Sequence, residues 1–107
     1  MPFLYLGMGK PLERLEASLT LNNLWLYSIK LILEKPTFSR ELYIRMKERY
    51  KIKANVITVY SVLYRLEREG YIQKSGNYRK YYEVTEKGRK EFENGIKLLE
   101  NILLSLK

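Results

Sequence analysis

The chain has 107 residues, a formal net charge of +8 and a sequence pI near 9.7. This length suits one domain with a single modest core and is short for a typical enzyme with two layers and a cleft. The sequence contains no Cys, His or Asp, which excludes disulfide frameworks, His- or Cys-based zinc sites, His general bases and aspartate-built metal sites. We therefore expect no catalysis, no metal and no other cofactor.

The positive charge is concentrated in the middle of the chain. Residues 40–90 hold fourteen Lys or Arg against six Glu, whereas the two flanks together hold six of each sign. An anionic polymer is the natural partner of such a localised field. An anionic lipid surface is the alternative, but no segment resembles a basic membrane-surface helix with an unpaired hydrophobic face. Nucleic acid is therefore favoured, and no membrane partner is expected.

Residues 1–11 predict an N-terminal arm, because Gly7, Gly9 and Pro11 interrupt regular structure. Two interpretations of its apolar residues stay open: packing across a partner subunit, or a frayed terminus. The segment has no charged leading end, and its apolar run is too short for a signal peptide or a membrane span. We expect a cytoplasmic protein.

The pattern is helical over residues 12–34, with a break expected near Asn22 and Asn23, either of which could cap a new helix. Its first turns carry a leucine stripe, and the later apolar residues cover a much broader surface. Such a segment is either central to a large core or shared between subunits. Because the chain is small, we predict a dimer interface that includes Leu15, Leu19 and Trp25.

A second helix is predicted over residues 39–49, after Pro36 ends the first one. Thr37 or Ser39 can cap its start. Residues 51–54 then form a turn that leads into a third helix. Two short helices separated by a turn indicate a helix-turn-helix, in which the first helix braces the second.

The third helix has the clearest pattern, with Asn55 as its N-cap and Gly70 just beyond its end. One stripe is apolar and faces a core: Val56, Val59, Leu63 and Leu66. The other face carries small hydrogen-bonding residues and two arginines: Thr58, Ser61, Arg65 and Arg68. This composition suits a helix that reads a DNA groove; the alternative is an ordinary amphipathic helix with a hydrated polar face.

A β-hairpin is predicted from residues 71–75 and 78–84, which are rich in aromatic and β-branched residues on both sides of a Gly-Asn turn. Lys74, Arg79 and Lys80 cluster near its tip, where they can contact phosphates or the minor groove. The alternative, charges that protect an edge from aggregation, predicts mixed signs, and the tip has no acid.

Thr85 is the predicted N-cap of a final helix over Glu86–Leu106. Its apolar residues alternate spacings of four and three, as in a coiled-coil seam: Phe92, Ile96, Leu99, Leu103 and Leu106. The helix packs either on its own domain or against a second copy. We favour the second copy, because the hairpin separates this helix from the first helices and the chain already has excess apolar surface.

Two segments resemble the PadR-type winged-helix transcriptional regulators. ITVYSVLYRLEREGYI, residues 57–72, is similar to their recognition helix, and RKYYEVTEKGR, residues 79–89, is similar to their wing and the start of their final helix. The chain departs from that pattern at residues 38–40, where many members have His-Gly-Tyr, and in lacking the Gly-Pro of longer wings. The resemblance implies a homodimeric repressor on a two-fold operator, with Tyr60, Arg65 and the wing tip near DNA.

The sequence therefore predicts an α+β fold: a winged helix-turn-helix of three helices and a two-stranded wing, with an extra C-terminal dimerisation helix. The expected parts are an arm (1–11), a DNA-binding domain (12–84) and the dimerisation helix (85–107). The expected DNA-binding residues are Asn55, Thr58, Tyr60, Ser61, Tyr64, Arg65, Arg68, Lys74, Arg79 and Lys80. The expected dimer residues are Leu15, Leu19, Trp25, Phe92, Ile96, Leu99, Leu103 and Leu106.

The predicted function is sequence-specific binding of double-stranded DNA at an inverted repeat, by a homodimer that regulates transcription as a repressor. The alternative is a winged-helix module whose reading helix packs on another protein. A small aromatic effector is a further predicted partner, because Trp25 and the tyrosines could line a pocket between subunits. A Trp on a crowded apolar helix is more often part of a core or an interface.

Overall fold

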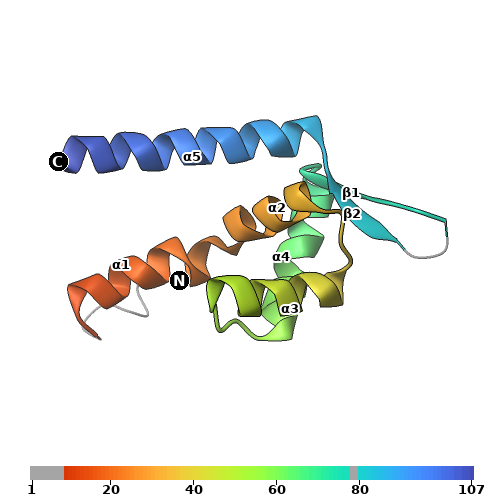
Figure 1. Cartoon of the computed structure of the whole chain (residues 1–107), viewed down its shortest axis with the longest axis horizontal. Helices are drawn as coiled ribbons and strands as arrows, with labels where there is room; N and C mark the ends of the chain where they lie inside the picture. Colours follow the sequence, from red (N-terminus) through yellow and green to blue (C-terminus); the bar gives the residue numbers. More distant parts are fainter. Residues whose placement is uncertain (1–8, 78–79) are drawn as a thin grey trace.

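The structure is a computed structural model that describes residues 9–77 and 80–107 (Figure 1). The elements are α1 (Pro11–Leu19), the short 3₁₀ helix η2 (Leu21–Asn23), α2 (Leu24–Glu34), α3 (Ser39–Tyr50), α4 (Val56–Arg68), β1 (Ile72–Ser75), β2 (Tyr81–Val84) and α5 (Glu86–Leu106). This arrangement confirms the predicted fold class. Most of the predicted N-terminal arm, and Tyr78 and Arg79 of the hairpin, lie outside the described residues.

The predicted break in the first helical segment is confirmed, since η2 separates α1 from α2. The prediction that an Asn side chain caps the new helix is wrong, because the side chain at the cap position accepts no hydrogen bond from the first amides of α2. Asn23 occupies the cap position of α2, but its side-chain amide donates to the Ser18 carbonyl at 2.5 Å, and its side-chain oxygen accepts from the Trp25 indole at 3.3 Å. Asn23 thus bridges the two sides of the break.

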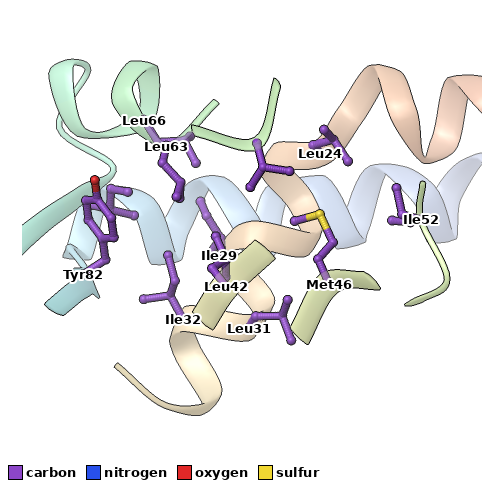
Figure 2. Close-up of a cluster of buried hydrophobic side chains, with 12 residues drawn as sticks. Leu24, Ile29, Leu31, Ile32, Leu42, Met46, Ile52, Leu63, Leu66 and Tyr82 are labelled. Atoms are coloured by element: carbon purple, nitrogen blue, oxygen red, sulfur yellow. The ribbon is translucent and has the colours of Figure 1, made fainter. Parts of the chain in front are cut away.

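The core is built around α2, which contacts α3, α4, α5 and β2. Its Ile29 and Leu31 are completely buried, and Figure 2 shows Leu42 and Met46 of α3 and Leu63 of α4 pointing into the same cluster. The broad apolar surface of α2 is therefore covered by other elements of the same chain. None of the residues of α1 is buried, so the leucine stripe of α1 has no such explanation.

Thr37 joins the start of α3 to the wing. Neither Thr37 nor Ser39 caps α3, because Phe38 occupies the cap position and no side chain bonds there. Thr37 is instead buried and pairs with Tyr82 of β2: the Tyr82 amide donates to the Thr37 carbonyl at 2.8 Å, and the Thr37 amide donates to the Tyr82 carbonyl at 3.4 Å. Its hydroxyl donates to Glu41 at 2.5 Å.

The wing is an antiparallel pair with Ile72 opposite Val84 and Ser75 opposite Tyr81. Both strands are shorter than predicted, beginning one residue later on the first side and at Tyr81 on the second. Ile72 and Tyr82 point inward and are buried, which fixes the strands against the helices.

Helix α5 has the predicted bounds, and the Thr85 hydroxyl caps it by accepting from the Gly88 amide at 3.1 Å. One argument from the sequence is wrong: the hairpin does not separate α5 from the first helices, because α5 lies against α2. In Figure 1 the C-terminal end of α5 and helix α1 lie on the same side of the molecule, opposite the wing.

Candidate nucleic-acid interface

Helix α4 presents the predicted polar face to solvent. Its buried stripe is Val59, Leu63 and Leu66. On the opposite side Thr58, Ser61, Arg65 and Arg68 are all exposed. The Asn55 side chain accepts from the Thr58 amide at 2.8 Å, which confirms the predicted N-cap.

The end of α4 is also as predicted. Gly70 has a φ of +87°, the left-handed conformation that favours glycine. The Gly70 amide donates to the Glu67 carbonyl at 3.1 Å, and the Tyr71 amide donates to the Leu66 carbonyl at 2.9 Å. These two bonds form a Schellman motif, which satisfies carbonyls that the helix end leaves free. Both ends of the candidate reading helix are therefore held by local chemistry.

The centre of the exposed face lies slightly to one side of the predicted one. At 3.6 residues per turn, the direction opposite the buried stripe passes between Ile57, Ser61 and Arg68. The Ile57 side chain is 74% exposed and Tyr64 is 64% exposed, whereas Tyr60 is only 38% exposed. Ile57 is thus a surface residue that the sequence analysis missed, because an apolar residue next to the core stripe was not considered for the outer face.

Cations flank this face on α4. The guanidinium of Arg68 lies 5.8 Å from the centre of the Tyr64 ring, a cation–π geometry that holds both side chains on the surface. No residue at positions 57, 58, 61, 64, 65 or 68 is acidic. The face therefore combines hydroxyl, aromatic and guanidinium groups without a carboxylate, which is suitable for an anionic partner.

The wing contributes Lys74 and Lys80, both exposed, while the predicted contact residue Arg79 lies outside the described residues. Lys74 is closer to the domain than the sequence indicated: its ammonium is 3.9 Å from a Glu67 carboxylate oxygen of α4 and 5.7 Å from the Tyr82 ring centre. The sequence of the wing tip contains no acidic residue, but Glu67 of α4 forms an ion pair with Lys74. The Lys80 ammonium donates to the Gly76 carbonyl at 2.9 Å.

Close contacts at one junction, two hydrogen bonds and a backbone approach, connect the end of α4 to the start of α5. The Thr85 hydroxyl donates to the Gly70 carbonyl at 2.6 Å, and the Lys87 ammonium donates to the Glu69 carbonyl at 2.6 Å. A Cβ added to Gly88 would lie 2.0 Å from the Tyr71 carbonyl oxygen, so only glycine allows this approach. The Gly of the second resemblance segment is therefore required by backbone contact.

The predicted dimer residues divide into two groups. Trp25 and Phe92 are partly buried against the core of their own chain, and Trp25 also lies against Gly95, where an added Cβ would meet its ring at 3.0 Å. The other group is exposed, on α1 and on the second half of α5: Leu15, Leu19, Ile96, Leu103 and Leu106. Leu99 lies between the two groups, partly buried beside Leu26 and Ile102.

Trp25 lines a cavity of about 260 Å³ inside one chain, between the start of α2, the second half of α4 and the start of α5. Of the tyrosines that the structure describes, only Tyr71 shares it, and the nearby Glu91 carboxylate raises the pKa of the Tyr71 phenol. Arg65 belongs both to this cavity and to the exposed face of α4. This cavity lies within one chain, and the predicted effector pocket between subunits stays a prediction.

A helix-turn-helix braced by a buried α2, followed by a two-stranded wing, defines a winged-helix protein. The chain belongs to the transcriptional regulator PadR-like family, whose sequence pattern it matches over residues 29–94. This confirms the resemblance inferred from the two sequence segments. Regulation of transcription is the function of this family, which is not one of enzymes. No curated protein matches the chain significantly.

Solved structures share the fold. A transcriptional regulator from Clostridium thermocellum has a TM-score of 0.68 and 23% identity, covering 77% of this chain and 84% of that one. One PadR-like transcriptional regulator from Bacillus cereus has a TM-score of 0.66 and 20% identity, covering 85% of this chain and 95% of that one. A second has a TM-score of 0.60 and 24% identity, covering 67% of this chain and 44% of that one.

No helix within residues 9–77 and 80–107 is long and apolar enough to cross a membrane. The same residues contain no cluster of three or more side chains of the types that hold metal ions.

Proposed function

We propose that this PadR-like regulator acts in the cytoplasm as a homodimeric repressor that binds double-stranded DNA at an inverted repeat. The observation that carries the proposal is the exposed face of α4, where Thr58, Ser61 and Arg65 lie away from the buried stripe and are open to solvent. A capped helix with such a face fits the major groove, where side chains near its N-terminal half reach base edges.

The DNA contacts follow from position on α4 and the wing. Thr58, Ser61 and Arg65 are assigned to base edges. Five further residues are assigned to the sugar-phosphate backbone from helix and wing: Asn55, Tyr60, Tyr64, Arg68 and Lys74. Lys80 and Arg79 are assigned to phosphates beside the wing. Residues 12–84 thereby form the DNA-binding part.

The second copy is supported by the apolar surface on α1 and on the second half of α5. Leu12 is 74% exposed, Leu103 is 54% exposed and Leu106 is 79% exposed. A solvated protein rarely keeps so many large apolar side chains exposed on two helices unless something covers them. Residues 85–107 are therefore assigned to dimerisation, together with α1. Two α4 helices related by a two-fold axis would read half-sites about 10 base pairs apart or a multiple of that spacing.

The experiment is a titration of labelled genomic fragments at several salt concentrations, followed by footprinting of the tightest fragment. Binding should weaken steeply with salt, because phosphate contacts release counterions. Lys80→Ala should reduce the log-log slope by roughly one, whereas Lys107→Ala, at the far end of α5, should leave the slope unchanged. Absence of any salt-sensitive binding to duplex DNA would refute the proposal.

One observation favours the alternative of a protein-interaction module, namely the exposure of Ile57 and Tyr64 on α4. Exposed aromatic and aliphatic side chains are typical of protein interfaces. The arginines beside them and the lysines on the wing favour DNA instead. The same titration separates the two functions, since a protein-binding module has no reason to shift duplex DNA in a salt-dependent way.

The predicted small aromatic effector has its best-supported place in the cavity lined by Trp25 and Tyr71. Trp25 is the only tryptophan in the chain, so its fluorescence reports on this cavity. A candidate effector should change that fluorescence and the affinity for DNA over the same concentration range. A change in DNA affinity without any change in Trp25 fluorescence would exclude this cavity.

A further inference from the structure

The exposed face of α4 carries an apolar line, formed by Ile57, Tyr60 and Tyr64, that is not part of the winged-helix core. Ile57 is 74% exposed, and with Tyr60, Ser61 and Tyr64 it forms one open surface of α4 that ends at Arg65 and Arg68. The core stripe of α4 is complete without Ile57, because Val59, Leu63 and Leu66 fill the opposite side.

The identity of residue 57 is not explained by the stability of the helix. A β-branched residue has a lower helix propensity than Ala, Lys or Glu. A solvated Ile side chain also forgoes the free energy that burial would provide. An apolar residue at this position is therefore better explained by a surface that covers it when a partner binds.

The position of Ile57 on α4 indicates which partner group covers it. Ile57 lies in the first turn, two residues after the Asn55 cap, and only the N-terminal part of a helix in the major groove approaches base edges. The thymine C5-methyl is the distinctive apolar group that a base pair presents in that groove. Arg68, at the other end of this surface, matches the phosphates that flank such a base.

We infer that Ile57 is a specificity-determining residue that selects thymine by packing on its C5-methyl group in the major groove. This inference rests on the proposed function and deepens it. Thr58 and Ser61 then hydrogen-bond to base edges beside the apolar contact. The recognised half-site must contain at least one thymine whose methyl group, and not only its hydrogen-bonding edge, contributes to affinity.

The test starts with selection of the preferred site from a pool of random duplexes with the full-length protein. Each thymine of the selected site is then replaced singly by deoxyuridine, which removes the methyl group and keeps the base-pairing edge. At one position per half-site the affinity should fall about fourfold, and about fifteenfold when both half-sites are changed. Ile57→Ala should weaken binding to the unmodified site by a similar factor and should no longer respond to deoxyuridine.

Ile44→Ala is the matched control, because Ile44 is a partly exposed isoleucine on the neighbouring helix α3. It should keep both the affinity and the deoxyuridine response of the wild type. Ile57→Val, which retains a branched side chain, should recover most of the response that Ile57→Ala loses. Circular dichroism should show that each variant is folded, since most of the Ile57 side chain is exposed.

Three results would overturn the inference in distinguishable ways. Sequence-specific binding with no deoxyuridine effect, or with an effect that persists in Ile57→Ala, would remove the assignment of Ile57 and leave the proposed function intact. Failure of the wild type to bind any duplex would remove both. Loss of binding to another protein in Ile57→Ala, with DNA binding unchanged, would assign the apolar line to a protein partner instead.

Discussion

Helices α4 and α5 both have amphipathic sequences, but only α4 buries most of its apolar stripe within the chain. In α4 the apolar stripe, which includes Val59 and Leu63, is buried within one chain. In α5 the comparable stripe is partly covered from Phe92, which packs on the core, to Leu99, which is partly buried beside Leu26, while Leu103 and Leu106 are 54% and 79% exposed. The amphipathic period therefore predicts that a helix has an apolar face, but it does not say whether the same chain covers that face.

The difference follows from where each helix is placed. Helix α4 lies between α2, α3 and β1, so its stripe meets neighbours along its whole length. Helix α5 contacts α2 and β2 near its start and then extends past the domain toward the side where α1 lies (Figure 1). The exposed half of α5 and the leucine stripe of α1 are both left uncovered by their own chain, as the proposed dimer requires.

The largest expected effect comes from charging the free half of α5. Leu103→Lys combined with Leu106→Lys should abolish the dimer, because four leucines per dimer would lose their burial, roughly 6 kcal/mol or more in total. Sedimentation at micromolar concentration should show a monomer that retains its helical circular dichroism. Asn94→Lys combined with Asn101→Lys, both exposed on the opposite side of α5, is the charge-matched control. A wild type that sediments as a monomer at that concentration would contradict the dimer.

A matched pair of leucine truncations tests the contrast between the two stripes. Leu63→Ala should lower the free energy of unfolding by about 2–5 kcal/mol, because it leaves a cavity in a filled core. Leu103→Ala should instead weaken the dimer, so that its deficit relative to wild type disappears on dilution to the monomer. Denaturant titrations over a hundredfold range of protein concentration measure both. Equal, concentration-independent losses would mean that α5 is packed within its own chain.

Arg65 separates base reading from general attraction to DNA. Arg65→Ala should weaken binding to the selected site by about 1–3 kcal/mol and binding to random duplex by less. Both affinities are measured at one salt concentration, with Arg14→Ala on α1 as the arginine control. Equal losses on the two duplexes would show that Arg65 contacts phosphate only.

The smallest expected effect concerns pH and the ion pairs between α2 and α3. The guanidinium of Arg49, bonded to Glu34, and the nearby Lys30 lower the pKa of the Glu34 carboxyl below its ordinary value of 4.5. A lowered pKa in the folded state contributes stability above about pH 4.5, which is lost as the pH falls through the folded-state value. Glu34→Gln should therefore lower the Tm slightly at pH 7 and should match wild type in strong acid. Glu48→Gln is the control on α3.

The sequence was sufficient wherever local chemistry decides the structure. The bounds of α4 and α5 follow from Asn55, Gly70 and Thr85, each of which acts on amides or carbonyls within a few residues of itself. The placement of the polar face of α4 follows in the same way from helical period. The predicted base-reading and dimer roles of these residues stay predictions.

The sequence was insufficient where distant segments meet. The pairing of Thr37 with Tyr82 replaces the expected helix cap, and it requires the wing to return to the start of α3. The contact of Gly88 with the Tyr71 carbonyl is likewise invisible in a pattern of residue types. Ile57 could have been found from the sequence, because helical period alone places it opposite the buried stripe.

The junction of Thr85, Lys87 and Gly88 with the end of α4 has a consequence for the whole assembly. These contacts connect the end of α4 rigidly to the start of α5, so the two helices should move together as one unit. The 21 residues of α5 span roughly 30 Å. In a dimer joined through α5, a change of about 10° in the angle between the two α5 helices would turn each helix by about 5°. Each α4 would then move by about 2.6 Å, and the distance between them would change by about 5 Å, against about 3.4 Å per base pair. In the proposed dimer, the length of α5 and the angle between the two α5 helices therefore set the spacing of operator half-sites that the two α4 helices can reach, although α5 itself contacts no base.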